Sequence, residues 1–126
     1  MSYKRVVLLQ LLQDIYPGVP IACGTTYSSI ILYYTSEPLV PETTISEKYA
    51  DYTLAHNLDV LRQERNSRLS QSDMYGLADY PFKSEESKQS FLDYRQELRN
   101  ITKTYPAPET DENDNLIGIV WPVKPQ

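Results

Sequence analysis

The sequence predicts an α+β fold, in which a short helix and a β-hairpin precede an antiparallel pair of helices and a C-terminal strand. Three observations support this prediction. Apolar residues recur at three- and four-residue spacing in three separate stretches, which is typical of helices with one buried face. Two short runs of β-branched and aromatic residues flank a loop that contains glycine. Prolines stand between these stretches, where they end helices or break strands.

The first predicted helix covers residues 4–14. Its apolar face consists of Val7, Leu8, Leu11, Leu12 and Ile15. The helix is ended by Pro17-Gly18, a pair that favours a turn. A basic pair followed by an apolar stretch is also typical of a signal peptide, but Gln10 and Asp14 interrupt the apolar stretch early. We therefore expect this segment to be a helix of the fold.

A β-hairpin is predicted next, with strands at residues 19–23 and 30–34. Pro20 places the first strand at an edge, because proline cannot donate a hydrogen bond to a neighbouring strand. We interpret Cys23 as a small buried side chain, since it is the single cysteine of the chain and cannot form an internal disulfide. Residues 37–41 are expected to be an extended linker, because each proline disfavours helix at the residue before it.

A long helix is predicted over residues 44–70, in which no glycine or proline occurs. Thr44 and Glu47 have the spacing of a capping box at its start. Ser84 is expected to cap a second helix, whose first turn is acidic. The apolar positions of that helix are Phe91, Tyr94, Leu98, Ile101 and Tyr105. We expect the two helices to form an antiparallel hairpin, and the sequence leaves open whether they pair within one chain or between chains.

Arg65 interrupts the apolar stripe of the long helix. The charges of the helix pair are typical of a solvated, salt-bridged helical hairpin. Alternatively, Arg65 makes a bidentate contact inside the hairpin with Asp93 or Glu97, and we favour a structural role for it. The other residues expected to hold the helix pair together are Tyr94, Arg95, Leu98 and Trp121.

The C-terminal part begins with a predicted acidic loop at residues 109–115, followed by a strand at 116–121. We expect two subregions, residues 1–40 with the first helix and β-hairpin, and residues 41–126 with the helix pair and the strand. Both are expected to belong to one compact unit, since the length suits a single domain.

Several functional classes are disfavoured by composition. The formal net charge is −5, which argues against a general nucleic-acid binder, because phosphate contacts need clustered Lys and Arg. One cysteine and one histidine, Cys23 and His56, supply neither a cysteine-based zinc site nor a well-supported nucleophile and base. Asp111-Glu-Asn-Asp-Asn115 opens like a calcium loop but lacks its glycine and its final glutamate. We expect no enzyme activity, no cofactor, no metal site and no membrane segment.

Tyrosine is unusually frequent, with eleven residues against two phenylalanines and one tryptophan. Tyrosine combines a large apolar area with a polar tip, and it is enriched at protein–protein interfaces. Some tyrosines can instead line a small core with their hydroxyl groups at its rim. The tyrosines that fall in the predicted hairpin and connector, and are candidates for partner binding, are Tyr27, Tyr33, Tyr34, Tyr75 and Tyr80.

Four motifs follow one another in the second half of the chain. They are Leu61-Arg-Gln-Glu-Arg-Asn-Ser-Arg-Leu-Ser-Gln-Ser-Asp73, Tyr80-Pro81, Phe91-Leu-Asp-Tyr-Arg-Gln-Glu-Leu-Arg-Asn-Ile101 and Trp121-Pro-Val-Lys-Pro125. In this order, over about residues 58–125, they resemble the bacteriophage tail assembly chaperone-like family. That family usually has tryptophan directly after the Ser-Asp pair, whereas Met74 stands here. Met74 is therefore a further candidate for partner binding.

The resemblance implies a non-enzymatic tail or tail-fibre assembly protein that binds another tail protein. The alternative is a permanent virion component, such as an adaptor or decoration protein of the tail, baseplate or fibre. The implied partner is a phage tail, baseplate or tail-fibre protein, and a homo-oligomer is left open. The implied location is the host cytoplasm during assembly, or the virion tail. No catalytic residues are implied.

Overall fold

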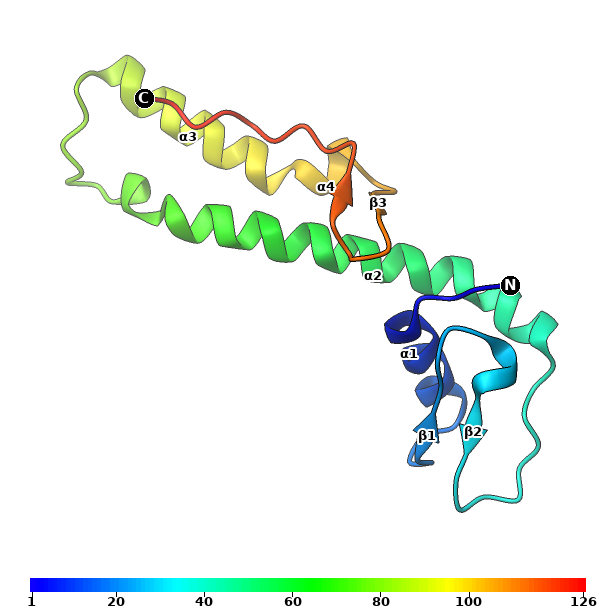
Figure 1. Cartoon of the computed structure of the whole chain (residues 1–126). Coiled ribbons are helices and arrows are strands. Elements are labelled where there is room, and N and C mark those ends of the chain that lie inside the picture. Colours follow the sequence, from blue (N-terminus) through cyan, green and yellow to red (C-terminus); the bar gives the residue numbers. More distant parts are fainter. The chain divides into compact units, whose positions relative to one another are not determined.

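The computed structural model describes all residues, 1–126, and confirms the α+β class (Figure 1). The chain divides into two compact units, which we call unit 1 (Met1–His56) and unit 2 (Asn57–Gln126). The division falls inside the longest helix, 16 residues beyond the boundary at residues 40 and 41 that the sequence suggested. Each unit is described by itself below.

Unit 1 begins with helix α1 (Arg5–Ile15), which confirms the first predicted helix. Its apolar face is buried because the side chains at three- and four-residue spacing all point to one side. Leu8, Leu11 and Leu12 are fully buried and form the centre of the unit 1 core. Gly18, with φ of +79°, provides the left-handed turn that follows the helix.

The predicted hairpin is present but short. Strands β1 (Ile21–Ala22) and β2 (Ile31–Leu32) pair antiparallel, with Ile21 opposite Leu32. The connection contains a short 3₁₀ helix, η1 (Tyr27–Ser29), so fewer residues remain for the strands than the sequence suggested. The Gly24 amide donates to the Ser29 hydroxyl oxygen over 2.8 Å and thereby holds this connection closed.

Tyrosine hydroxyl groups fix the extended linker to the core of unit 1. Tyr16 donates to the Pro38 carbonyl oxygen and accepts from the Val40 amide, both over 2.9 Å. Tyr27 donates to the Val40 carbonyl oxygen over 2.7 Å. Extended backbone lacks bonds within its own segment, so these side chains satisfy polar groups that would otherwise depend on water.

Helix α2 (Glu42–Gln71) confirms the predicted long helix, but its start was predicted wrongly. It begins two residues before Thr44, which therefore lies inside the first turn and does not act as its cap. The Thr44 amide instead donates to the Pro41 carbonyl oxygen over 3.0 Å. Proline has a fixed φ close to the helical value, so Pro41 starts the helix earlier than the capping motif would.

In unit 2, α2 is followed by a short 3₁₀ helix, η2 (Asp73–Gly76), and then by helix α3 (Glu85–Arg99), which runs antiparallel to α2 (Figure 1). The predicted cap is confirmed, since the Ser84 hydroxyl oxygen accepts from the Ser87 amide over 3.1 Å. Phe91, Tyr94 and Leu98 are buried, as their spacing predicted.

The second helix does not continue unbroken to Tyr105. Asn100 interrupts it, and a single turn, α4 (Ile101–Thr104), follows. The predicted terminal strand at 116–121 is reduced to β4 (Leu116–Ile117), which pairs antiparallel with β3 (Glu109–Thr110). Asp111 and Asn115 close the intervening turn, and Gly118 ends β4 because its φ of +72° departs from extended backbone.

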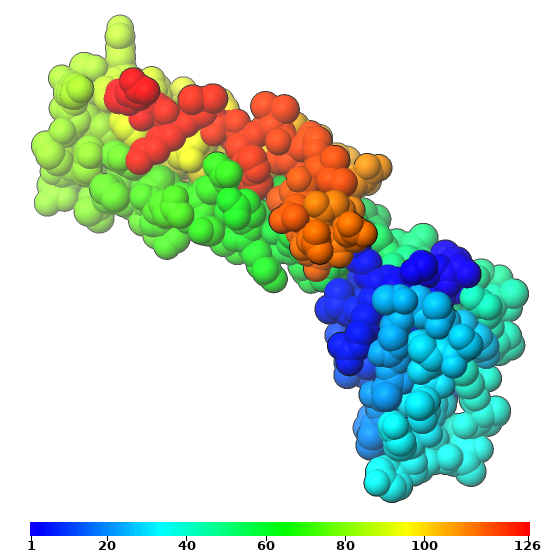
Figure 2. Space-filling model, viewed as in Figure 1, coloured from blue at the N-terminus to red at the C-terminus, as the bar shows by residue number.

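The C-terminal tail, residues 118–126, continues without helix or strand along the surface of unit 2 (Figure 2). The Val120 amide donates to the Tyr105 hydroxyl oxygen over 3.1 Å. The Arg68 guanidinium lies over the Trp121 ring, 4.3 Å from its centroid. These contacts hold the tail against both α2 and α4. Trp121 is half-buried.

Candidate partner-binding site

Arg95 joins the two helices at the closed end of the helical hairpin. Its guanidinium donates to the Leu69 carbonyl oxygen over 3.0 Å and to the Ser72 hydroxyl oxygen over 2.8 Å. It also forms an ion pair of 3.2 Å with Asp73. The Arg95 side chain is only 11% exposed, so these bonds are partly shielded from water. Arg95 therefore fixes the connector that carries the candidate site.

The interhelical contact expected of Arg65 is absent, so that prediction was wrong. The Arg65 guanidinium donates to the neighbouring Asn66 side chain over 3.1 Å, and it pairs with neither Asp93 nor Glu97. Side chains of adjacent helical residues reach each other at the surface, where a long arginine loses less entropy than it would in an interhelical bridge. Arg95 takes the structural role that the sequence interpretation gave to Arg65.

An aromatic cluster lies beside this joint. Tyr75 stacks on Phe91 with ring centroids 4.0 Å apart and an interplanar angle of 18°. Tyr80 meets Tyr75 edge to face at 4.9 Å, and Phe82 lies 4.6 Å from Tyr80. Such offset and edge-to-face arrangements add to the stability gained from burial. The connector thus forms a packed aromatic surface that α3 supports through Phe91.

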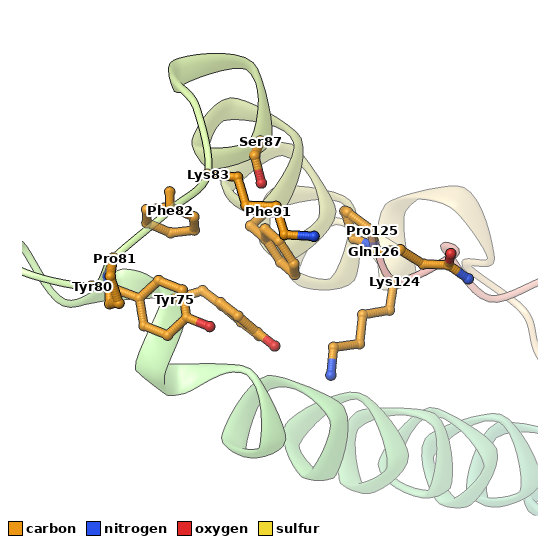
Figure 3. Close-up of a pocket in the computed structure, with 10 residues that line it drawn as sticks. All are labelled: Tyr75, Tyr80, Pro81, Phe82, Lys83, Ser87, Phe91, Lys124, Pro125 and Gln126. Carbon is orange, nitrogen blue, oxygen red and sulfur yellow. The ribbon is translucent and has the colours of Figure 1, made fainter.

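The cluster lines an open cavity of about 340 Å³, which we call the aromatic hollow (Figure 3). The residues that line it are Tyr75, Tyr80, Pro81, Phe82, Lys83, Ser87, Phe91, Lys124, Pro125 and Gln126. The C-terminal tail closes one side, and the Lys124 ammonium group lies 5.4 Å from the centroid of the Tyr75 ring. Figure 3 shows Lys83 and Lys124 extending into the hollow from opposite segments.

The sequence-predicted tyrosines separate into different environments. Tyr75 and Tyr80 lie together in the aromatic hollow, and Met74 lies next to them in the chain with 47% of its surface exposed. Tyr33 and Tyr34 belong to unit 1, where they are 43% and 96% exposed. The candidates therefore form two groups, one in each unit.

Tyr27 does not lie in either exposed group. Its ring packs against the unit 1 core, and its hydroxyl group is bonded to the Val40 carbonyl oxygen. Its proposed role in partner binding is not supported by this placement, because the polar tip is already bonded within the chain. The position in the hairpin connection indicated exposure, but the η1 turn directs the ring inward.

Sequence reasoning did not identify Phe82, Lys83, Lys124 or Pro125 as site residues. Phe82 and Lys83 follow Tyr80-Pro81 directly, so an aromatic run around proline was the signal available for them. Lys124 and Pro125 lie more than 40 positions away in the sequence. They reach the hollow only because the tail returns along α3, and nothing in the local sequence indicates that return.

Polar and titratable groups outside the hollow mostly serve local structure. No group of three or more His, Cys, Asp or Glu side chains could hold a metal ion. The Asp111 carboxylate accepts from the Asn113 and Asn115 amides, both over 2.9 Å, and so serves its own turn. Burial raises the pKa of the Cys23 thiol, although the nearby Arg5 charge opposes this effect. No helix is both long enough and apolar enough to cross a membrane.

A family model described as phage tail assembly chaperone protein matches residues 58–126, which is more than half of the chain and covers all but the first residue of unit 2. The chain therefore belongs to the phage tail assembly chaperone family, and its role lies in phage tail assembly. No curated protein and no solved structure matches the chain. The aromatic hollow lies entirely within the matched residues.

Proposed function

We propose that the protein acts in tail assembly by binding another phage tail or tail-fibre protein through the aromatic hollow, without catalysing a reaction. The observation that carries this proposal is the open aromatic cluster of Tyr75, Tyr80, Phe82 and Phe91 within the family-matched region. Aromatic anchors supported by a rigid element are typical of the residues that dominate binding energy at protein interfaces.

The supporting geometry favours a preorganised surface. Phe91 is 7% exposed and belongs to α3, so the ring on which Tyr75 stacks is held by the helix. Arg95 fixes the preceding turn by its bonds to Leu69 and Ser72. A partner that binds here meets side chains that are already ordered, which reduces the entropy lost on association.

A capture experiment tests this proposal. The tagged chain is co-expressed with the tail and tail-fibre proteins of the phage that encodes it, and captured proteins are identified by mass spectrometry. We expect wild type to retain a tail protein, and Tyr80→Ala to weaken binding at least about tenfold, as loss of an interface anchor does. Tyr34→Ala is the matched control, because it removes an exposed tyrosine from unit 1.

The results for the two variants distinguish a binding surface in the aromatic hollow from one in unit 1. Loss of capture by Tyr34→Ala with full capture by Tyr80→Ala would place the binding surface in unit 1 and overturn the assignment to the aromatic hollow. Capture of no tail protein by wild type would overturn the proposed function.

A second measurement separates transient assembly from the alternative, a permanent virion component. Quantitative mass spectrometry of purified phage particles gives the copy number of the chain per tail. We propose that the chain acts in the host cytoplasm during assembly and is absent from mature particles. A stoichiometric amount in purified virions would instead identify it as an adaptor or decoration protein.

A further inference from the structure

We infer that the aromatic hollow recognises an acidic segment of its partner that carries an aromatic side chain. This inference rests on the proposed function and specifies the chemistry of the bound segment. It follows from the charges, the hydrogen-bond donors and the size of the hollow.

The charges in the hollow are positive and unpaired. Lys83 and Lys124 line it, no Asp or Glu side chain does, and neither lysine forms an ion pair. Arg95, which fixes the turn before the hollow, is already engaged because it pairs with Asp73. The two ammonium groups that line the hollow attract an anionic partner group.

The hydrogen-bonding groups of the hollow point to the same ligand chemistry. The hydroxyl groups of Tyr75, Tyr80 and Ser87 line the hollow, and none of them has a hydrogen-bond partner in the structure. Together with the two ammonium groups they can donate several hydrogen bonds to one bound group. Carboxylates accept several bonds at once and form the stronger, charge-assisted kind with lysine. An acidic side chain can therefore accept bonds from several of these groups at once.

The apolar surface of the hollow favours an aromatic side chain in the bound segment. Tyr80, Phe82 and Pro81 present rings rather than flexible chains, and aromatic rings pack favourably against another aromatic ring. The volume of about 340 Å³ is close to the lower limit of small-ligand sites, so it accommodates one large side chain and its neighbours rather than a folded surface. A short segment with one aromatic anchor between acidic residues fits both features.

Single-stranded nucleic acid is the other ligand class that combines negative charge with flat rings. Its binding needs a basic groove that follows several phosphates, whereas the hollow offers two lysines on an acidic chain. The observations therefore favour a protein segment, and an oligonucleotide serves as a competing probe in the test.

Fluorescence anisotropy with labelled peptides tests the inference. The probes are Gly-Asp-Glu-Trp-Asp-Glu-Gly, its amide analogue Gly-Asn-Gln-Trp-Asn-Gln-Gly, its alanine analogue Gly-Asp-Glu-Ala-Asp-Glu-Gly, and single-stranded oligothymidine. We expect the first peptide to bind most tightly and both analogues to bind at least about tenfold more weakly. Added salt should weaken the binding of the first peptide more than that of its amide analogue. Equal binding of the acidic peptide and its amide analogue, or tighter binding of oligothymidine, would overturn the inference.

Charge-reversed variants test whether the acidic peptide binds in the aromatic hollow. Lys83→Glu with Lys124→Glu removes both ammonium groups of the hollow and should weaken the acidic peptide at least about tenfold. The matched control is Lys48→Glu with Lys103→Glu, which changes the net charge equally at two exposed lysines outside the hollow. Far-ultraviolet circular dichroism and Trp121 fluorescence check that both variants are folded. Equal weakening in the two double variants would show a general charge effect and overturn the inference.

The same two double variants in the capture experiment separate this inference from the proposed function. If both still retain the tail protein equally, acidic recognition fails while partner binding stands. If wild type retains no tail protein, the proposed function fails, whatever the peptides do. If only the Lys83 and Lys124 variant loses the tail protein, both proposals are supported.

Discussion

Unit 1 and unit 2 use their tyrosines differently. In unit 1, the hydroxyl groups of Tyr16, Tyr27 and Tyr52 bond to the linker or to Asp14, and the rings lie against an aliphatic core. In unit 2, Tyr75 and Tyr80 form an open cluster whose hydroxyl groups have no partner. Bonded tyrosines therefore complete the fold of unit 1, whereas Tyr75 and Tyr80 form an open cluster in unit 2.

The difference has a physical origin in how each unit obtains its core. Unit 1 buries leucines of α1 together with Ile45 of α2, and the rings of Tyr3 and Tyr16 complete this core. In the helical hairpin of unit 2 the fully buried leucines are Leu61 and Leu98, and aromatic rings and Arg95 provide much of the remaining contact. In such a unit, aromatic and polar side chains remain at the surface, where they are available to contact a partner. The predictions below test this comparison.

The largest effect is expected from the aliphatic core of unit 1. Leu12 is 0% exposed, so Leu12→Ala should lower the free energy of unfolding by about 2–5 kcal/mol through lost burial and a cavity. Val6→Ala on the same helix is the control, because Val6 is 51% exposed. Hydrogen exchange measured by mass spectrometry should assign the loss of protection to unit 1. Equal destabilisation by the two variants would contradict a core centred on α1.

The joint of unit 2 is expected to show the next largest effect. Arg95→Ala removes charge-assisted bonds to Leu69 and Ser72 and should cost about 1.5–3 kcal/mol. Trp121 is the single tryptophan and lies in unit 2, so its fluorescence during urea unfolding reports on this unit. Arg65→Ala is the control and should change stability by less than about 0.5 kcal/mol. A larger loss from Arg65→Ala would restore Arg65 as the structural arginine.

A smaller effect is expected from the tyrosine hydroxyl groups of unit 1. Tyr16→Phe keeps the ring but removes the bonds to Pro38 and Val40, and it should cost about 0.5–1.5 kcal/mol. Tyr34→Phe removes a hydroxyl group from a side chain that is 96% exposed and should leave thermal unfolding unchanged. If Tyr16→Phe is equally neutral, these hydroxyl groups do not close the rim of unit 1.

The smallest effect is a dependence on alkaline pH. The Tyr52 hydroxyl bonds to the Asp14 carboxylate over 2.6 Å, which raises the pKa of Tyr52 above 10.0. Burial, together with Glu42, raises the pKa of Tyr3. Folding therefore favours the protonated tyrosines, and this contribution is present below pH 10.0 and is lost as pH rises through the higher folded pKa values.

Unfolding measured across this alkaline range should show stability falling with pH for wild type. The decrease should be smaller in the double variant Tyr3→Phe and Tyr52→Phe, because the raised pKa values are removed with the hydroxyl groups. An identical dependence on pH in both proteins would contradict the assignment to these two tyrosines.

Local sequence signals predicted the positions of the main helices well, but they predicted the start of α2 and the lengths of the strands less well. The apolar spacing of α1 and the Ser84 cap of α3 act within a few residues, and both were confirmed. Thr44 was wrongly expected to cap α2, because Pro41 provides a competing local start that the capping motif does not reveal. Strand lengths were overestimated because pairing depends on the connections, such as η1, as much as on β-branched residues.

The candidate site was predicted in part. Tyr75 and Tyr80 were identified because exposed connectors rich in tyrosine are typical of interfaces. Lys83 and Lys124 were missed because their common location depends on the path of the C-terminal tail. Arg95 was identified as structural, but the sequence did not show that its partners are Leu69, Ser72 and Asp73.

The sequence by itself determined the order of the main helices, their buried faces and the resemblance in residues 58–125, because these depend on short-range spacing and on motif order. Only the tertiary structure decided which tyrosines are bonded within the chain and which remain open. It also decided that Lys124 meets Tyr75, since that contact joins residues far apart in the sequence of unit 2. The physical reason is that a hydrogen bond or ring contact depends on distance in space, which the spacing of residues along a chain does not specify.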